Sequence, residues 1–549
     1  MSILPCSFAW AQNSQFAAND SGHVQAQDTK SETHDPKPSV NLPEGVTAGP
    51  VVEGTRQYTL ENGLTVLLSP DASKASVTVN MTYLVGSRHE NYGQTGMAHL
   101  LEHMLFRGTP SLPNALAEFS KRGLRANGST SSDRTNYYAT FASDPELLEW
   151  YLRWQADVMV NATIAKEDLD AEMTVVRNEM EAGENSPFES LMQKVQSAAY
   201  QWHNYGNDTI GARSDVENVD IEQLRAFYRL YYQPDNAVLI VSGRFDLQKT
   251  LDLVANAFLE IPQPKRSLAP EYTIEPVQEG EQKVIVRRQG GTPLVLAQYH
   301  IPAAASPEFV AFDLGAMILA DTPSGRLYKA LVQKGLAAHS FGFARPMRQP
   351  GYALFGAQLE NGMNPDEALN TLTETLEDLE TQPFTDEELE RARTQWMTSW
   401  EQTHADPASL ASALSESAAL GDWRLFYWTR EQAEKANLKA VQEVTSAYLL
   451  PSNRTTGLYI PTESTRRAPK PEAKDPAALL KDFEGREVND PTDAFEASPQ
   501  NIDAQTIRET LSLDNGTIEL ALLPKPTRGD RVEARLLLQA GSAEDLENL

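Results

Sequence analysis

The pattern His-Leu-Leu-Glu-His at residues 99–103 constrains the fold of this chain more than any other feature. In an α-helix, positions i and i+4 share a face, so His99 and His103 can reach one metal ion while Glu102 lies beside it. The surroundings favour a helix, because an apolar stripe follows helical spacing and Gly108 comes after it. The stripe consists of Met97, Leu100, Leu101, Met104 and Leu105. We therefore predict a short helix that lines a cleft and holds a zinc ion used for hydrolysis.

One further interpretation of this pattern stays open. A helix with two hydrogen-bonded histidines and a surface glutamate would carry the same residues without binding metal. The chain has 9 histidines among 549 residues, and with this composition the pattern arises by chance in about one of a hundred such chains. Chance therefore explains the pattern poorly, and a third metal ligand should exist elsewhere in the chain.

A second predicted helix, residues 167–182, supplies acidic residues for such a site. Catalytic zinc sites use three protein ligands and keep an open position for water. Glu172 and Glu179 are seven residues apart, almost two helical turns, so they point in nearly the same direction. Spacing alone leaves open which of them binds metal. The apolar stripe of this helix is Leu169, Met173, Val176 and Met180, and the competing acids are Asp168, Asp170, Glu181 and Glu184.

These residues resemble those of the M16 metallopeptidases, the inverzincin group that includes pitrilysin, insulin-degrading enzyme and the mitochondrial processing peptidase. In that family a glutamate ligand follows the H-x-x-E-H helix about 75 residues later, in a helix that reads E-x-x-x-V-V/I-x-x-E. Here residues 172–179 read Glu-Met-Thr-Val-Val-Arg-Asn-Glu, and Glu179 lies 76 positions after His103. The resemblance implies one Zn²⁺ per chain, held by His99, His103 and Glu179. It also implies that Glu102 is the general base and that Glu172 is an acidic neighbour that supports the site.

Further segments extend the resemblance over most of residues 55–245. The segment Ala126 to Tyr138 resembles the family's edge strand, to which substrate adds as an extra strand. The resemblance thus implies substrate binding by Ala126, Asn127 and Gly128. Main-chain hydrogen bonds of this kind favour extended peptides with limited sequence demands. An ordinary polar strand is the alternative interpretation. The other matching segments are 85–90, 106–109 and 231–243.

Two parts of the chain repeat one local pattern. The Asn-Gly turn at residues 60–63 is followed by an alternating strand at 77–85, and the Asn-Gly turn at 513–516 is followed by an expected strand at 532–540. With the resemblance, this repeat predicts an α+β fold of M16-type domains (LuxS/processing-peptidase-like), each a mostly antiparallel sheet packed with helices. Long family members carry four such domains. We expect this chain to hold the first half and a fragment of the third domain.

The expected organisation has six parts. Residues 1–11 resemble a signal peptide remnant, 12–50 a disordered tail, 51–265 the metal-binding domain, 270–462 a second domain without a ligand pattern, 463–505 a linker and 506–549 the truncated start of a third domain. In the second domain we expect strands at 283–288 and 294–301 and helices near 309–319, 325–333 and 366–379.

The amino terminus and the net charge bear on location and partners. Ala9 and Ala11 form the small-x-small pattern of a signal cleavage site, which predicts a periplasmic or secreted protein. A cytosolic protein with a disordered tail is the alternative, because a charged n-region is missing. Cleavage would remove Cys6, the only cysteine, and with it any disulfide or thiolate ligand. The formal charge of −29 argues against nucleic-acid or anionic-membrane binding, and no apolar run reaches the roughly 20 residues of a membrane span.

These observations predict a zinc-dependent endopeptidase that hydrolyses peptides or small unfolded proteins with water activated by the metal and Glu102 as general base. An oxyanion stabiliser is also required. The larger family members place an arginine and a tyrosine from the second half there, so the resemblance implies that a missing C-terminal half or a partner subunit is needed. The alternative is a non-catalytic or partner-dependent M16-like subunit that binds zinc or peptide without turnover by itself.

Overall fold

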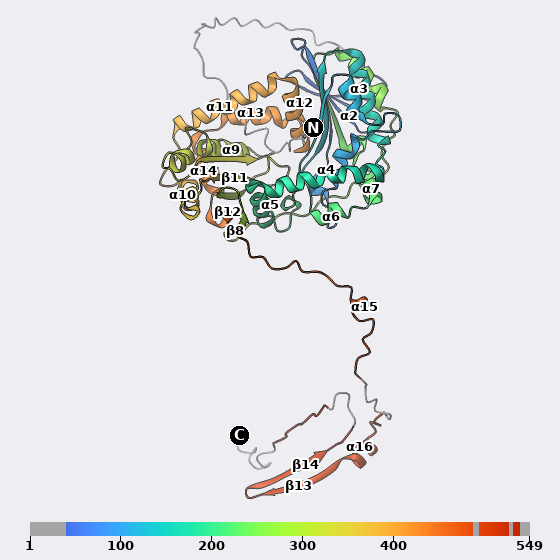
Figure 1. Ribbon diagram of the computed structural model, residues 1–549, viewed down its shortest axis with the longest axis vertical. Helices are drawn as coiled ribbons and strands as arrows, with labels where there is room; N and C mark the ends of the chain where they lie inside the picture. The colour runs from blue at the N-terminus through green and yellow to red at the C-terminus, as the bar shows by residue number, and fades with distance from the viewer. Residues whose placement is uncertain (1–39, 487–493, 526–530, 539–549) are drawn as a thin grey trace, which may run out of the picture. The chain divides into compact units, whose positions relative to one another are not determined.

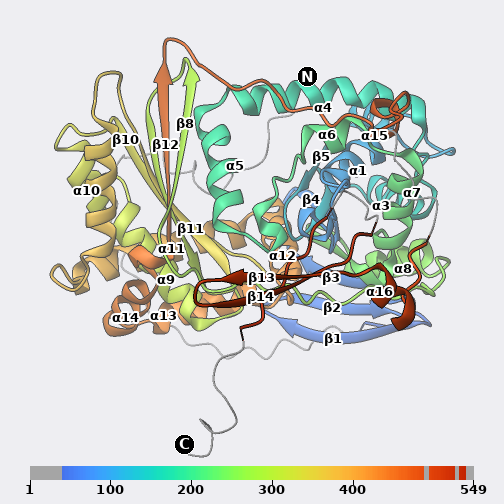
Figure 2. The same ribbon diagram turned by 90° about the horizontal axis from the view of Figure 1, so that it is seen from below.

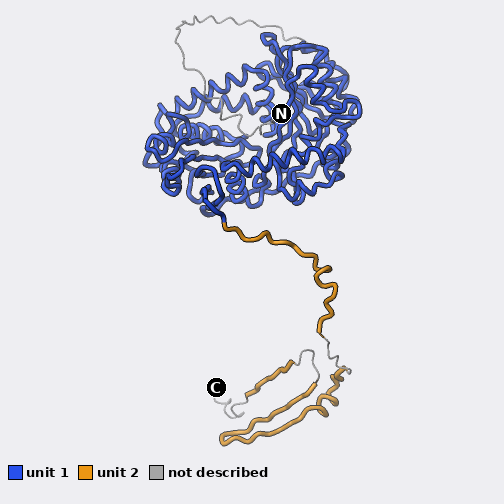
Figure 3. Tube along the Cα trace, in the orientation of Figure 1, with its two compact units in different colours: residues 1–465 blue, residues 466–549 orange. Residues whose placement is uncertain are grey.

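The computed structural model describes residues 40–486, 494–525 and 531–538 (Figure 1). The chain divides after Thr465 into two compact units, which Figure 3 shows in different colours. The first unit contains two β-sheets with helices packed on them, and the second contains a β-hairpin.

The first sheet has seven strands in the order β1-β2-β3-β7-β4-β6-β5. Neighbouring strands are antiparallel except for the parallel pair of β3 and β7. The strands are β1 (Val46–Val52), β2 (Thr55–Leu60), β3 (Thr65–Pro70), β4 (Ser76–Tyr83), β5 (Arg125–Thr130), β6 (Thr135–Ala142) and β7 (Ala237–Gly243). The helices of this region are α1 (Met97–Leu105), α2 (Ala115–Lys121), α3 (Pro145–Asn161), α4 (Lys166–Asn185), α5 (Pro187–Ala199), α6 (Arg213–Glu217), α7 (Ile221–Tyr231) and α8 (Leu247–Phe258).

The second sheet has five strands in the order β10-β11-β9-β12-β8. Its strands are β8 (Gln282–Gln289), β9 (Leu294–Ile301), β10 (His339–Arg345), β11 (Gly351–Gln358) and β12 (Arg454–Thr462). Its helices are α9 (Pro307–Ala320), α10 (Pro365–Glu377), α11 (Asp386–Ala405), α12 (Pro407–Ala419), α13 (Leu425–Lys435) and α14 (Leu438–Tyr448). We refer to residues 46–261 as the first lobe and to residues 282–462 as the second lobe.

The two sheets repeat one topology. The order β8-β12-β9-β11-β10 matches β3-β7-β4-β6-β5 strand for strand, and the parallel pair recurs as β8 with β12. In both lobes the outermost strand of this series, β5 or β10, follows a helix that packs against it, α1 or α9. The expected α+β fold with repeated, mostly antiparallel domains is confirmed.

Local sequence explains where many helices begin. In the two lobes, five helices start at a side chain that accepts a hydrogen bond from the first turn, followed directly by proline at the first helical position. Such a pair satisfies a free N–H and presets the backbone angle of the first turn. The pairs are Asp144-Pro145, Ser186-Pro187, Ser306-Pro307, Asn364-Pro365 and Asp406-Pro407.

The core explains why some strands read as continuous apolar runs. Every residue of β7 is buried, and so is every residue of β4 except its first. Helix α12 of the second lobe contacts both strands, and α3 also packs on β4 (Figures 1 and 2). Because both faces of the central sheet are covered, β7 reads as an apolar run from Ala237 to Val241, whereas β4 keeps its polar and apolar alternation although its polar side chains are buried too. The second lobe therefore forms part of the core that supports the first.

Two predicted segments differ from the structure, and a third lies outside the described residues. The tail expected for residues 12–50 contains the start of β1, because Val46–Val52 pair with β2, a contact that local composition cannot reveal. The helix expected at 325–333 contains a π-helical turn at Tyr328–Val332. The signal-peptide residues 1–11, with Cys6, lie outside the described residues.

The second unit departs from prediction at its last expected strand. The Asn-Gly turn joins β13 (Ile507–Leu513) and β14 (Gly516–Leu522) into the expected hairpin. Residues 531–538 have no regular structure, so the strand expected at 532–540 is wrong over this range, because it has no hydrogen-bonded neighbour in the described part of the unit. The expected linker contains two short helices, α15 (Pro476–Leu479) and α16 (Pro499–Gln505).

Candidate metal centre

The two histidines lie on the buried helix α1, as their spacing predicts. Apart from His99, whose side chain is 17% exposed, every residue of α1 is buried. The rings of His99 and His103 lie edge to face with their centres 4.8 Å apart. Both imidazoles therefore share one face of a helix that the surrounding core holds in place.

Helix α4 packs against α1 and brings the predicted third ligand to the histidines (Figure 2). The Oε2 atom of Glu179 lies 3.7 Å from Nε2 of His99 and 3.6 Å from Nε2 of His103. One ligand atom from each of the three residues falls within 4.8 Å of the other two. In the described residues, no other group of His, Cys, Asp and Glu side chains meets this condition.

Glu172 lies about two turns before Glu179 on α4 and makes a different contact. Its Oε2 atom lies 3.1 Å from Nδ1 of His103 and accepts a hydrogen bond from that ring. Its other oxygen forms an ion pair with Arg107. This places a carboxylate behind a histidine whose opposite nitrogen faces Glu179, which is how metal-binding histidines are commonly oriented.

The charges around this point favour a cation. Burial and the adjacent His103 lower the pKa of His99 to about 4. Burial alone would lower the pKa of His103 too, but the carboxylates of Glu172 and Glu179 outweigh it and raise this pKa to about 10 in the metal-free chain. Two carboxylates thus converge on one imidazole, an arrangement that favours a cation at this point. Two imidazole nitrogens, one carboxylate oxygen and a partly exposed face fit a zinc ion with an open position.

Glu102 is buried between α1 and the edge strand β5. It is 8% exposed, and its Oε2 atom accepts a hydrogen bond of 2.6 Å from the hydroxyl of Thr130. Burial raises the pKa of the Glu102 carboxyl. A Cβ atom on Gly128 would lie 2.9 Å from Cγ of Glu102, so only glycine lets β5 approach this side chain. A carboxylate with a raised pKa beside a metal site is suited to accept a proton.

On the edge strand β5, the main-chain groups of alternate residues have no strand partner in the described part of the chain. Among the described residues β5 pairs only with β6. Ser131 N–H donates to the carbonyl of Arg134, and alternation along the antiparallel register then directs the main chain of Asn127 toward β6. By the same alternation the N–H and C=O groups of Ala126, Gly128 and Thr130 point outward. Of the three predicted substrate-binding residues, Ala126 and Gly128 therefore have main-chain groups directed away from β6, with Ala126 partly exposed and Gly128 buried.

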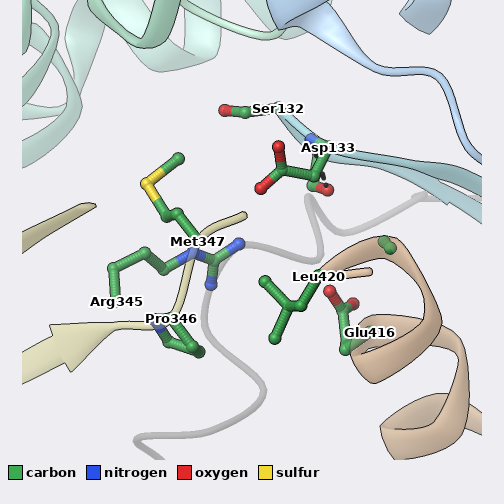
Figure 4. Close-up of a pocket in the computed structure, with 9 residues that line it drawn as sticks. Ser132, Asp133, Arg345, Pro346, Met347, Glu416 and Leu420 are labelled. Atoms are coloured by element: carbon green, nitrogen blue, oxygen red, sulfur yellow. Dashed lines mark hydrogen bonds between the residues drawn. The ribbon is translucent and has the colours of Figure 1, made fainter. Parts of the chain in front are cut away.

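The second lobe contacts the tip of this edge strand (Figure 4). The turn after β5 and loops of the second lobe enclose a cavity of about 20 Å³, enough for one water molecule. Asp133 Oδ1 lies 2.8 Å from Nε of Arg88 and accepts a hydrogen bond of 2.8 Å from the hydroxyl of Tyr205. Arg134 forms an ion pair with Glu416 of α12. The cavity is lined by Ser131, Ser132, Asp133, Arg345, Pro346, Met347, Glu416, Ala419 and Leu420.

Sequence reasoning missed several residues of this centre. Thr130 lies inside a segment quoted for the family resemblance, but no local pattern ties its hydroxyl to Glu102. Arg107 follows His103 by four residues, one helical turn, and this spacing was the available signal. Arg134 and Glu416 are 282 residues apart in sequence, so no pattern along the chain links them.

Known proteins place this chain in a family. The sequence profile described as "Insulinase (Peptidase family M16)" matches residues 65–213, and the one described as "Peptidase M16 inactive domain" matches residues 218–396. The zinc protease PqqE of Helicobacter pylori is 30% identical over 344 residues, which cover 61% of this chain and 77% of that protein. The chain belongs to peptidase family M16.

Solved structures show the same M16 architecture. The crystal structure of a protease from Helicobacter pylori matches with a TM-score of 0.71 at 26% identity, over 74% of this chain and 99% of that chain. PqqL of Escherichia coli is 26% identical over 380 residues, which cover 65% of this chain and 40% of PqqL. The first half of the periplasmic protease PqqL shares the fold, with a TM-score of 0.63 at 21% identity over 76% of this chain and 94% of that chain.

Membership in M16 agrees with the predicted peptidase family and with the predicted use of zinc. The insulinase profile over residues 65–213 includes the histidine and glutamate cluster, and two similar proteins are named as zinc proteases. The helices of the described residues include none with the length and apolar character needed to cross a bilayer.

Proposed function

We propose that this M16 chain binds one zinc ion through His99, His103 and Glu179 and supplies the catalytic lobe of a zinc-dependent endopeptidase. One observation carries the proposal. The ligand atoms of these three residues lie within 4.8 Å of one another, directly beside the buried Glu102 and an edge strand with free main-chain groups. A helix with merely hydrogen-bonded histidines would not need a third converging carboxylate.

The chemistry follows from the side chains around the ligands. Zinc bound by two imidazoles and one carboxylate lowers the pKa of a water molecule at its open position to about 7. Glu102 would accept the proton of the attacking water and pass it to the leaving amine. The hydroxyl of Thr130 holds the Glu102 carboxylate, since it donates to Oε2 at 2.6 Å. Glu172 orients the ring of His103 through Nδ1 and leaves Nε2 free to bind metal.

Substrate would add to β5 as a further strand. The outward main-chain groups of Ala126, Gly128 and Thr130 can pair with an extended peptide, which would then pass beside Glu102. Main-chain pairing selects an extended conformation more than particular side chains. Peptides and small unfolded proteins can adopt this conformation, so they are the proposed substrate class. We propose a periplasmic or secreted location, which the likeness to PqqL and the small-x-small pattern at Ala9 and Ala11 support.

A second candidate is an M16 subunit that binds zinc or peptide but needs another M16 half for turnover. The match of residues 218–396 to a domain described as inactive favours it. So does the share of PqqL that the chain matches, 40% of that protein's length. In this version an oxyanion stabiliser comes from the second half, as the family resemblance implies.

One experiment separates the candidates. The purified chain is analysed for metal and assayed with an internally quenched peptide, before and after chelation and zinc restoration. We expect one zinc per chain and turnover that chelation removes and zinc restores. Bound zinc without turnover, followed by turnover on joining a second M16 half, supports the second candidate. A chain that binds no zinc contradicts both.

A further inference from the structure

The two metal-binding histidines are held in different ways. Nδ1 of His103 donates to Glu172, which fixes the ring from behind. Nδ1 of His99 is buried, and no described residue is within hydrogen-bonding distance of it. Behind the ring, the orientation of His99 therefore depends on the backbone of α1 and on packing, since only its Nε2 atom faces a charged group, Glu179 at 3.7 Å.

The backbone at the start of α1 is held by Glu90. This side chain is fully buried, and its two oxygens accept hydrogen bonds of 2.8 Å each, one from Gly96 N–H and one from Ala98 N–H. Ala98 directly precedes His99. Glu90 thus binds two of the free N–H groups in the first turn of the metal-binding helix, a position where a carboxylate is also favoured by the helix dipole.

The N-cap residue of α1 cannot perform this task itself. Gly96 has no side chain, and its φ of 92° lies in the left-handed region. A Cβ atom at Gly96 would lie 2.7 Å from the carbonyl oxygen of Ile210 and 2.7 Å from Cγ2 of Val216. Five other helices of the two lobes begin with a side-chain cap of their own followed by proline, whereas α1 takes its cap from six residues upstream.

Glu90 is itself well anchored. Asn204 donates from Nδ2 to the carbonyl oxygens of both Arg88 and Glu90, at 2.8 Å each. The loop between Glu90 and Gly96 is largely exposed, and its Tyr92 does not pack on the core. Thr95 at the end of this loop donates to Asp215 from its N–H at 3.2 Å and from its hydroxyl at 2.8 Å, so Glu90 and Asp215 together hold the loop at the start of α1.

We infer that Glu90 is a positioning residue for the zinc site. Glu90 fixes His99 through the backbone of the first turn of α1, whereas Glu172 fixes His103 through its ring. The inference rests on the proposed zinc site, but it concerns residues that do not touch the metal. Removal of the Glu90 carboxylate should let the first turn fray and His99 move. Zinc affinity should then fall even though all three ligands are present.

The test compares Glu90→Ala and Glu90→Gln with Asp144→Ala. Asp144 caps α3 in the same lobe by accepting from Glu146 N–H and Leu147 N–H, and α3 carries no proposed ligand. Zinc affinity is measured by competition with a chromophoric chelator, and hydrogen exchange is followed by mass spectrometry over residues 97–100. We expect Glu90→Ala to lower zinc affinity about 10- to 100-fold and to speed exchange in that peptide. Glu90→Gln, which keeps one acceptor, should fall between Glu90→Ala and wild type.

The control variant should lose stability with little change in zinc affinity. If Asp144→Ala lowers zinc affinity as much as Glu90→Ala, the effect is general destabilisation and the inference is wrong. Wild-type zinc affinity in both Glu90 variants would overturn it too, and a Glu90→Ala chain that does not fold leaves Glu90→Gln to decide. A wild-type chain without zinc affinity refutes the proposed function itself, which is a distinguishable result.

Discussion

The two lobes use one topology for different purposes. In the first lobe β4 leads to α1 and then to the edge strand β5, and in the second β9 leads to α9 and then to β10. Helix α1 carries His99, Glu102 and His103 into the core, where Glu179, Thr130 and Glu172 meet them. Beyond Glu308 in its first turn, helix α9 is apolar except for Asp313, which accepts a hydrogen bond of 3.0 Å from Nε1 of Trp396. The fold supplies a place for a site, and a few side chains decide whether one is built there.

The edge strands repeat the same contrast. Both contain a glycine where the preceding helix comes close. At Gly128 of β5 a Cβ atom would meet Cγ of Glu102 at 2.9 Å, whereas at Gly342 of β10 it would meet Phe355 at 2.3 Å and Ala320 at 2.9 Å. One glycine makes room for the proposed base and the other for apolar packing. A close contact between the helix and the edge strand is therefore common to both lobes. Only in the first lobe does this contact involve a proposed catalytic side chain.

The largest expected effects come from two variants of α1, one that should affect proton transfer and one that should affect metal binding. Glu102→Gln should retain zinc and lower turnover by about 10²- to 10⁴-fold, because the amide cannot accept the proton. His103→Ala should lose zinc as well as turnover, because one of the three ligands is gone. Metal analysis beside a quenched-peptide assay measures both. Cleavage by the Glu102→Gln chain at the wild-type rate would refute the assignment of the base.

The paired glycines allow a direct test of the comparison. Gly128→Ala should displace Glu102 and lower turnover by up to about 100-fold, as small misplacements of catalytic groups do. Gly342→Ala should lower the free energy of unfolding by about 1–3 kcal/mol through overpacking, with turnover of the folded chain unchanged. Turnover and denaturant unfolding of both variants check this. Equal losses of turnover would show that the second edge strand takes part in catalysis.

A smaller effect on zinc affinity is expected from Glu172, which contacts the proposed ligand His103. Glu172→Gln keeps the shape of the side chain but replaces the carboxylate that accepts from Nδ1 of His103 and pairs with Arg107. Zinc affinity should fall about 10- to 100-fold. Competition with a chelator measures it, with Glu184→Gln, farther along α4, as the control. An unchanged affinity would mean that Glu172 does not act on the metal through His103.

Spacing along the chain predicted a good part of this site and missed the rest for physical reasons. His99, Glu102 and His103 lie on one helix, so helical periodicity alone gathers them. Glu172 and Glu179 share a second helix that its acidic residues and spacing made a candidate, but only the family resemblance assigned Glu179 as the ligand. Thr130 and Glu90 act through contacts made after the chain has folded, and neither belongs to a periodic pattern.

In the fold, too, features that depend on local sequence were predicted and features that depend on distant contacts were missed. The repeated sheets and the hairpins at both Asn-Gly turns follow from alternation and turn residues, which are local. The first strand, Val46–Val52, falls within the expected tail because its pairing with β2 is not visible in its own residues. The strand expected at 532–540 fails for the opposite reason, since its alternating pattern is present but no neighbour pairs with residues 531–538 among the described residues.

The smallest expected effect tests the polar residue of α9 in the second lobe. Burial raises the pKa of Asp313 from 3.8 to about 6, so the folded chain holds this proton more tightly than the unfolded chain. The associated stability is present below about pH 4 and is lost as the pH rises through 6. Asp313→Asn, which can still accept from Trp396, should therefore raise the free energy of unfolding at pH 8 by about 1–3 kcal/mol and change little at pH 4. Denaturant unfolding at both pH values measures this, with the exposed Glu401→Gln on α11 as control, and an equal gain at both pH values would contradict the assignment to Asp313.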